Sequence, residues 1–274
     1  MDDRAPMLGA ALAYYTVFSL APLLVLSIAV AGFVLGQEAA QGQIFDQVRM
    51  LIGDEGARAI QDMVLSANAK PTTGLFATII GVITLLVGAS GIFGQLQTSL
   101  NIIWGVQPKP GRGLAGMVRD RFLSFGFILV VCFLLLVSLL LSAAITFVAT
   151  WVGGVAVGTE ILAHIVNVVL SLGIITLLFA LIFKYLPDAR IAWRDVWIGA
   201  FLTAFLFGLG KFALGLYLGA STVSSSFGAA GSLIVLLVWV YYSAQILFFG
   251  AEFTQVYANR LGNHVRPSAN AVEV

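Results

Sequence analysis

The sequence predicts an all-α polytopic membrane protein, a bundle of six transmembrane helices with short amphipathic helices in the first outer loop. Of its 274 residues, 60% are hydrophobic and 10% are charged, whereas soluble domains average about 45–50% apolar and about 25% charged residues. Six apolar stretches each reach the roughly 20 residues that a helix needs to cross a bilayer. Lysine and arginine fall almost entirely into every second gap between these stretches, a distribution that the positive-inside rule explains.

The six apolar stretches place the helices in order along one integral membrane domain, 1–274. We expect spanning helices at about 8–36, 73–104, 122–152, 159–185, 196–219 and 229–257. Runs of this length exceed the roughly 9–11 residues of a transmembrane β-strand, so an all-helical bundle follows. The first residues lack the basic region and cleavage site of a signal peptide, and we expect the first stretch to remain as a helix.

The long first loop carries its own helical pattern. Apolar residues recur at helical spacing in two sets separated by Gly53, namely Ile44, Phe45, Val48, Leu51 and Ile52, then Ala57, Ile60, Met63, Val64 and Ala67. The outer segment 41–70 is therefore predicted to form two short amphipathic helices that lie on the outer surface or cap the bundle. Packing as a cap is favoured over a role in gathering a substrate.

The basic residues orient the chain. On one side lie Arg4, Lys109, Arg112, Arg119, Arg121, Lys184, Arg190, Arg194, Arg260 and Arg266. On the other side lie only Arg49, Arg58 and Lys70, all in the first loop. Because basic loops stay in the cytoplasm, both termini are predicted to be cytoplasmic. Aromatic residues at helix ends agree, with Trp104, Tyr185, Trp193, Trp197 and Tyr257 at the inner interface and Trp151 and Tyr217 at the outer one.

Two local features shape the helices. Pro22 stands in the middle of the first helix, where it removes a backbone hydrogen bond and is predicted to kink the helix, with Ser19 as one group that could offset the loss. Small residues recur on single faces, namely Gly74, Gly81, Gly88, Gly91 and Gly94 in the second helix and Gly215 and Gly219 in the fifth. Such faces favour close helix packing, permit a homo-oligomer and also occur in sliding transporters.

Ionisable residues at membrane depth are the sharpest functional candidates, since one charge at the bilayer centre costs about 2.5–3.5 kcal/mol on insertion scales. Lys211 lies in the outer half of the fifth helix. Glu160 and His164 share one face of the fourth helix at similar depth, and Asn167 extends that face by one turn. A substrate-binding cluster with Lys211 paired to Glu160 is one interpretation. Snorkelling of Lys211 to the outer interface is the other.

Glu252 is a further candidate, in the sixth helix near its cytoplasmic end. By this topology it is too far from Lys211 to pair with it. Arg4, Lys184 or water is the expected partner of its carboxylate.

Four segments resemble the YihY/BrkB family of bacterial inner-membrane proteins: AALAYYTVFSLAP at 10–22, FGQLQTSLNIIW at 93–104, KYLPDARIAWRDVWIGA at 184–200 and GSLIVLLVWVYYSAQILFFGAEFTQVYA at 231–258. The resemblance covers nearly the whole chain, although family members usually carry a longer segment before the first helix. It implies a multi-pass protein of the bacterial inner membrane. Members have been called virulence factor BrkB, one branch has been linked to export of a lipopolysaccharide precursor, and an older label is ribonuclease BN.

The residues argue against an enzyme and against that older label. A nuclease needs clustered metal or proton ligands beside a basic RNA path, but the only histidines, His164 and His264, fall on opposite sides of the membrane. No Walker-type phosphate loop occurs, and the single cysteine, Cys132, cannot form a metal cage. We expect no cofactor, no metal and no nucleic-acid partner.

Two functions remain open. The first is a transporter or flippase for an anionic or amphiphilic, lipid-like substrate, with membrane lipids, and among them an anionic lipid or a lipopolysaccharide precursor, as partners. The second is a scaffold or lipid-binding assembly protein that moves nothing. A continuous groove lined by the polar residues distinguishes the first from the second.

Overall fold

The computed structural model describes residues 4–68, 91–109, 159–220 and 229–273, together with the single positions Gly88, Gly126, Leu134 and Val137. The helices expected at 73–104 and 122–152 therefore fall wholly or partly outside the described residues. The described chain is mostly helical. Its long helices are α1 (Ala5–Leu35), α2 (Gln37–Asn68), α5 (Thr159–Tyr185), α6 (Trp193–Ala220) and α8 (Ala229–Arg260), and residues 91–103 form a further helical segment.

Hydrophobic length explains where these helices begin and end, because a helix in lipid satisfies its own backbone and is limited by bilayer thickness. Among the described residues, three stretches are long and apolar enough to cross a membrane: Val168–Tyr185, Trp193–Leu214 and Ile234–Arg260. A fourth is added if the bent α1 counts as one span. The described chain is thus helical with three or four candidate membrane spans, and the count of six spans stays a prediction.

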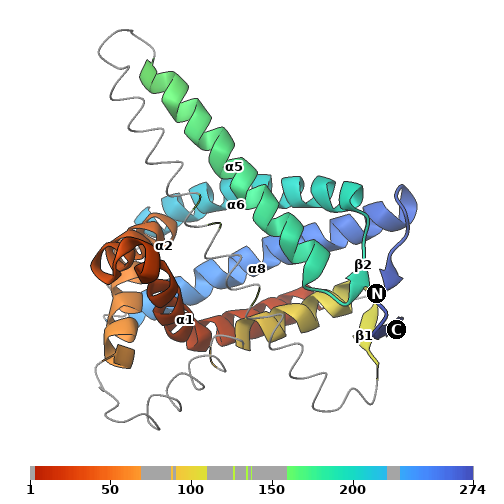
Figure 1. Ribbon diagram of the computed structural model, residues 1–274, viewed down its shortest axis with the longest axis horizontal. Coiled ribbons are helices and arrows are strands. Elements are labelled where there is room, and N and C mark those ends of the chain that lie inside the picture. The colour runs from red at the N-terminus through yellow and green to blue at the C-terminus, as the bar shows by residue number, and fades with distance from the viewer. Residues whose placement is uncertain are drawn as a thin grey trace.

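The helices α1, α6 and α8 follow the long axis of the molecule, and both termini lie at the end that also carries β1 and β2 (Figure 1). Helix α2 lies at the opposite end. It runs as one helix through Gly53, where the sequence analysis placed a break between two short helices. Phe45, Ile60 and Val64 of α2 are buried in one cluster with residues of α1 and α8, so the apolar face of α2 packs on the bundle.

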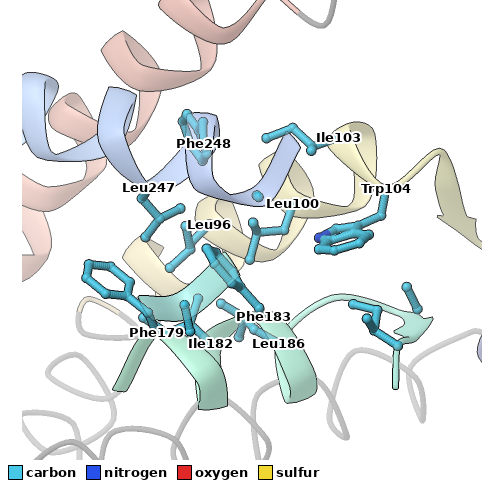
Figure 2. Packing of buried hydrophobic residues seen from close by; sticks show 14 of the residues in the cluster. Leu96, Leu100, Ile103, Trp104, Phe179, Ile182, Phe183, Leu186, Leu247 and Phe248 are labelled. Atoms are coloured by element: carbon cyan, nitrogen blue, oxygen red, sulfur yellow. The ribbon is translucent and has the colours of Figure 1, made fainter. Parts of the chain in front are cut away.

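The main core joins the helical segment 91–103, α5 and α8 (Figure 2). Leu100, Phe183 and Phe248 are fully buried in it. Within a bilayer such packing stabilises the fold chiefly through dispersion contacts, since lipid is as apolar as the side chains. Trp104 also belongs to this core and is only 3% exposed. Its ring packs inside the protein, and its predicted position at the inner membrane interface stays a prediction.

Helix α1 bends by 47° between Ala5–Leu20 and Pro22–Ala29. A Cβ on Gly88 would lie 3.0 Å from Cγ of Pro22, and one on Gly91 would lie 3.0 Å from Oγ of Ser19. Two glycines of the small face in the second predicted helix thus accommodate the bent part of α1. The chain then leaves α1 through Gly36, whose φ of 83° suits a glycine at a helix C-terminus.

Helices α6 and α8 run antiparallel and touch through a reciprocal pair of contacts. Thr203 and Thr254 are fully buried, and each donates its hydroxyl to the carbonyl oxygen four residues earlier, at Gly199 (2.7 Å) and Gly250 (2.6 Å). A Cβ on Gly199 would lie 2.7 Å from Cβ of Thr254, and one on Gly250 would lie 2.9 Å from Cβ of Thr203. We call these four residues the Gly–Thr contact. It brings the two backbones together as small residues do in membrane helices.

Two small antiparallel sheets close the end that carries the termini. Strand β1 (Val106–Pro108) pairs with β4 (Ala271–Glu273), and β2 (Ala189–Arg190) pairs with β3 (Arg266–Pro267). The segment after α8 therefore returns onto both connections that lie at this end. These strands were not predicted from the sequence, since each pairs only two or three residues across more than 70 positions of chain.

Candidate functional site

Lys211 is an exposed cation on α6, a helix that is otherwise apolar through its middle. It lies 18 residues after Trp193, where α6 begins at the end of the molecule that carries the termini. At 1.5 Å per residue this separation is about 27 Å, close to the roughly 30 Å of a hydrocarbon core. Lys211 thus lies toward the end of α6 that is far from the termini, and its depth in a bilayer stays a prediction.

Lys211 lines a tight pocket between α6 and α8, together with Phe207, Leu214, Trp239, Tyr242, Ser243 and Ile246. Three of these residues carry aromatic rings, Phe207 on α6 and Trp239 and Tyr242 on α8. Phe207 lies edge-on to Phe179 of α5, with ring centres 5.8 Å apart, and edge-on to Trp239 of α8, with ring centres 5.9 Å apart. Lys211 is visible in the sequence from its charge, whereas the aromatic residues are not, because only the packing of α6 on α8 brings them to it.

The predicted partners of Lys211 lie on α5. Glu160, His164 and Asn167 belong to the first turns of α5, but their side chains are not among the described ones. In Figure 1 this end of α5 projects away from α6 and α8. The pairing of Lys211 with Glu160 stays a prediction.

Glu252 is half-buried on α8. The Gly–Thr contact fixes the register of the two helices, and this register places Glu252 level with Phe201 of α6. Lys211 lies ten residues further along α6, about 15 Å by the helical rise. The two charges therefore cannot form a direct ion pair, in agreement with the sequence analysis.

A groove lies on the other flank of the same helix pair, with a volume of about 360 Å³. Its lining residues are Leu206, Leu209, Gly210, Ala213, Tyr242, Gln245, Ile246 and Phe249. Gln245 donates from Nε2 to the carbonyl oxygen of Ala5, which ties this flank to α1 (3.2 Å). The groove and the Lys211 pocket share Tyr242 and Ile246, so one wall of side chains separates them.

A polar clamp holds the end of the bundle that carries the termini. The Asn101 side chain donates from Nδ2 to Oδ2 of Asp188 (3.1 Å) and accepts from the Asp188 backbone N–H at its Oδ1 (2.8 Å). Gln97 donates more weakly to the same carboxylate oxygen (3.5 Å). The clamp joins the helical segment 91–103 to the connection after α5. Its polar groups bond to one another, so they hold these two segments together.

Replacing Asn101 by leucine is expected to lower the free energy of unfolding by about 1–3 kcal/mol, because two partly buried polar groups of Asp188 lose these partners. Thermal unfolding in detergent measures the loss. Gln97→Leu is the matched control and should cost much less, since its hydrogen bond is long. Equal effects of the two variants would show that Asn101 does not hold Asp188.

The described basic side chains are more numerous at one end of the molecule than at the other. Those at the end of the molecule with β1 and β2 are Arg4, Lys109, Lys184, Arg190, Arg194, Arg260 and Arg266. Arg49 and Arg58 lie on α2 at the opposite end. Within the described part of the chain, no three histidine, cysteine, aspartate or glutamate side chains form a group that could hold a metal ion.

The chain is similar to one family of known proteins. The family model described as virulence factor BrkB matches residues 1–273. A UPF0761 membrane protein of Verminephrobacter eiseniae (strain EF01-2) is 31% identical over 257 residues, which are 92% of this chain and 58% of that protein. One from Tolumonas auensis (strain DSM 9187 / NBRC 110442 / TA 4) is 29% identical over 259 residues, 92% of this chain and 80% of that protein.

A third relative, the UPF0761 membrane protein PSPA7_4558 of Pseudomonas paraeruginosa (strain DSM 24068 / PA7), is 30% identical over 259 residues, 92% of this chain and 59% of its own length. The chain thus spans little more than half of the Verminephrobacter and Pseudomonas proteins. No solved structure matches it.

Proposed function

The chain belongs to the virulence factor BrkB family of membrane proteins, and from this premise we propose that it binds an anionic, lipid-like molecule between α6 and α8 and carries it across the bacterial inner membrane. Lys211 is the residue that would attract the negative charge. Glu160, His164 and Asn167 on α5, and Glu252 at the opposite end of α8, are proposed to border the path.

The observation that carries the proposal is the exposure of Lys211 within a candidate membrane span. A lysine at this depth costs free energy unless it meets a counter-charge or water. Tyr242 and Ser243 line the same pocket and supply hydroxyl groups that donate hydrogen bonds to a phosphate or carboxylate. The other lining side chains are apolar and aromatic and fill the pocket, so an amphiphile would lie against its exposed edge at Lys211.

The distribution of basic residues supports an orientation. The end with β1 and β2 carries most of the described arginines and lysines, and the positive-inside rule assigns such an end to the cytoplasm. We therefore propose that both termini are cytoplasmic, and that the Lys211 pocket opens toward the outer leaflet. In this proposal the chain is no enzyme and binds no nucleic acid, and its partners are lipids and, through its small-residue faces, other copies of itself.

A second candidate function is a lipid-binding scaffold that transports nothing. The Gly–Thr contact favours it, because Thr203 and Gly250 close the two helices on each other directly beyond the end of the groove. A bound lipid would then be held in one leaflet. Transport requires α6 and α8 to separate at this contact.

Lys211→Met is expected to lose a tightly retained anionic lipid. Native mass spectrometry of protein extracted into lipid nanodiscs measures retention, and we expect a decrease of at least about tenfold because a hydrogen bond to a charged group contributes about 1.5–3 kcal/mol. Lys109→Met is the matched control, since Lys109 is an exposed lysine at the opposite end, beside Ala269.

The same variants in liposomes separate the two functions. Flipping of fluorescent phosphatidylglycerol by the wild type but not by Lys211→Met supports transport. Retention of lipid without flipping supports the scaffold. Equal retention by Lys211→Met and wild type contradicts both, because Lys211 then only snorkels to the interface.

A further inference from the structure

Along the axis of the α6–α8 pair, polar side chains at one height are followed by mainly apolar side chains at the next. The register that pairs Gly199 with Thr254 sets Tyr242 level with Lys211. Consistent with this register, the hydroxyl oxygen of Tyr242 would lie 3.2 Å from a Cβ on Gly210, the residue before Lys211. Leu206 lies five residues, and Phe249 seven residues, nearer to the end that carries the termini, about one and a half to two turns away. Side chains that suit a lipid head group are therefore followed along the bundle by side chains that suit a hydrocarbon chain. A phospholipid in one leaflet has its head group and its chains in the same order.

The groove has the shape of a channel for a chain. Gly210 lies at its buried floor, where the ring of Tyr242 packs against the glycine. Leu209 and Phe249 stand at its rims and are about half exposed. From Leu206 to Ala213 the groove follows about 10 Å of helix. A second helix is about 10 Å wide and favours flat faces of small residues, so bulky rims around 360 Å³ suit a single hydrocarbon chain better.

We infer that this groove holds one acyl chain of an anionic phospholipid, whose head group lies at Tyr242, the side chain that borders both the groove and the Lys211 pocket, within reach of the Lys211 ammonium. The chain points toward the Gly–Thr contact. The position of the head group in this inference rests on the proposed function. The position of the acyl chain rests on the groove alone. The groove residues then select the lipid by its chain, and Lys211 selects it by its charge.

Photo-crosslinking tests the inference. Wild-type protein is placed in phosphatidylcholine nanodiscs doped with phosphatidylglycerol that carries a diazirine on one acyl chain, and labelled peptides are mapped by mass spectrometry. We expect groove residues to be labelled several-fold more than the exposed lipid-facing residues Phe201 and Phe205. A phosphatidylcholine probe with the same chain should label the groove several-fold less.

Ala213→Phe fills the groove without touching Lys211, and it is expected to lower groove labelling at least about fivefold. Gly208→Phe is the matched control, since Gly208 is exposed on the same helix and a Cβ there meets nothing within 4 Å. Size-exclusion chromatography and thermal unfolding confirm that each variant folds. Leu209→Trp narrows the same groove and replaces Ala213→Phe if that variant fails to fold.

The outcomes separate this inference from the proposed function. Equal labelling by both probes, unchanged in Lys211→Met, keeps the chain in the groove but overturns the anionic head group and the proposed function with it. Labelling that is uniform over all exposed faces, and equal in Ala213→Phe and Gly208→Phe, overturns the groove even if Lys211→Met still loses its lipid. Protein–protein cross-links through the groove would overturn it in favour of a second copy.

Discussion

Replacing Phe248 by alanine should lower the free energy of unfolding by about 3–5 kcal/mol, the largest loss that we expect from one substitution. Phe248 is 0% exposed and lies in the core that joins α8 to α5 and the helical segment 91–103 (Figure 2). Its removal leaves a cavity whose lining loses dispersion contacts, and lipid cannot enter to restore them. Thermal or denaturant unfolding in a mild detergent measures the effect.

The neighbouring phenylalanine provides the control. Phe249 is 55% exposed and faces the groove, so Phe249→Ala removes the same atoms at little cost to the fold. We expect its midpoint of unfolding to stay near that of the wild type. A loss from Phe249→Ala as large as that from Phe248→Ala would mean that α8 is rotated relative to the core described above.

Gly199→Ala is the second substitution with a large expected effect. The added Cβ would lie 2.7 Å from Cβ of Thr254 and 3.0 Å from its Cγ2, and Thr254 is fully buried and cannot move aside. Overpacking of this kind costs about 1–3 kcal/mol. We expect lower abundance in the membrane and a lower unfolding temperature in detergent. Gly250→Ala should behave alike, since its Cβ would meet Thr203.

Gly208→Ala is the matched control on the same helix, because a Cβ there meets nothing within 4 Å. Alanine favours a helix over glycine by about 1 kcal/mol, so this variant should be neutral or slightly stabilised. Thr254→Gly in the Gly199→Ala background removes the clashing atoms and should restore part of the loss. Absence of that rescue would mean that Gly199 and Thr254 are not in contact.

Sequence alone predicted the helices well where hydrophobic length decides them. The stretches 159–185, 196–219 and 229–257 correspond to α5, α6 and α8 within three residues at each end. The bilayer sets these limits, since a helix must cover the hydrocarbon and its flanking charges must leave it. The same argument identified Lys211, because a charge in an apolar run is visible without any knowledge of packing.

Contacts between helices were not visible in the sequence. The spacing Gly-x-x-x-Thr recurs at Gly199 and Thr203 and again at Gly250 and Thr254, and this repeat was the available signal for the Gly–Thr contact. The sequence analysis instead singled out Gly215 and Gly219, whose surroundings lie outside the described residues. Spacing shows which residues share a face, but only the rotation of α6 and α8 shows which faces meet.

The sequence by itself therefore determined the membrane class of this protein, the ends of its main helices and the presence of a lysine, Lys211, within an apolar helix. The tertiary structure alone decided the rest. It joined Asn101 to Asp188 across 87 positions, returned β3 and β4 onto distant connections and set Tyr242 beside Lys211. The physical reason is that helix formation in lipid depends on local hydrophobicity, whereas each of these contacts depends on side-chain fit between segments far apart in the chain.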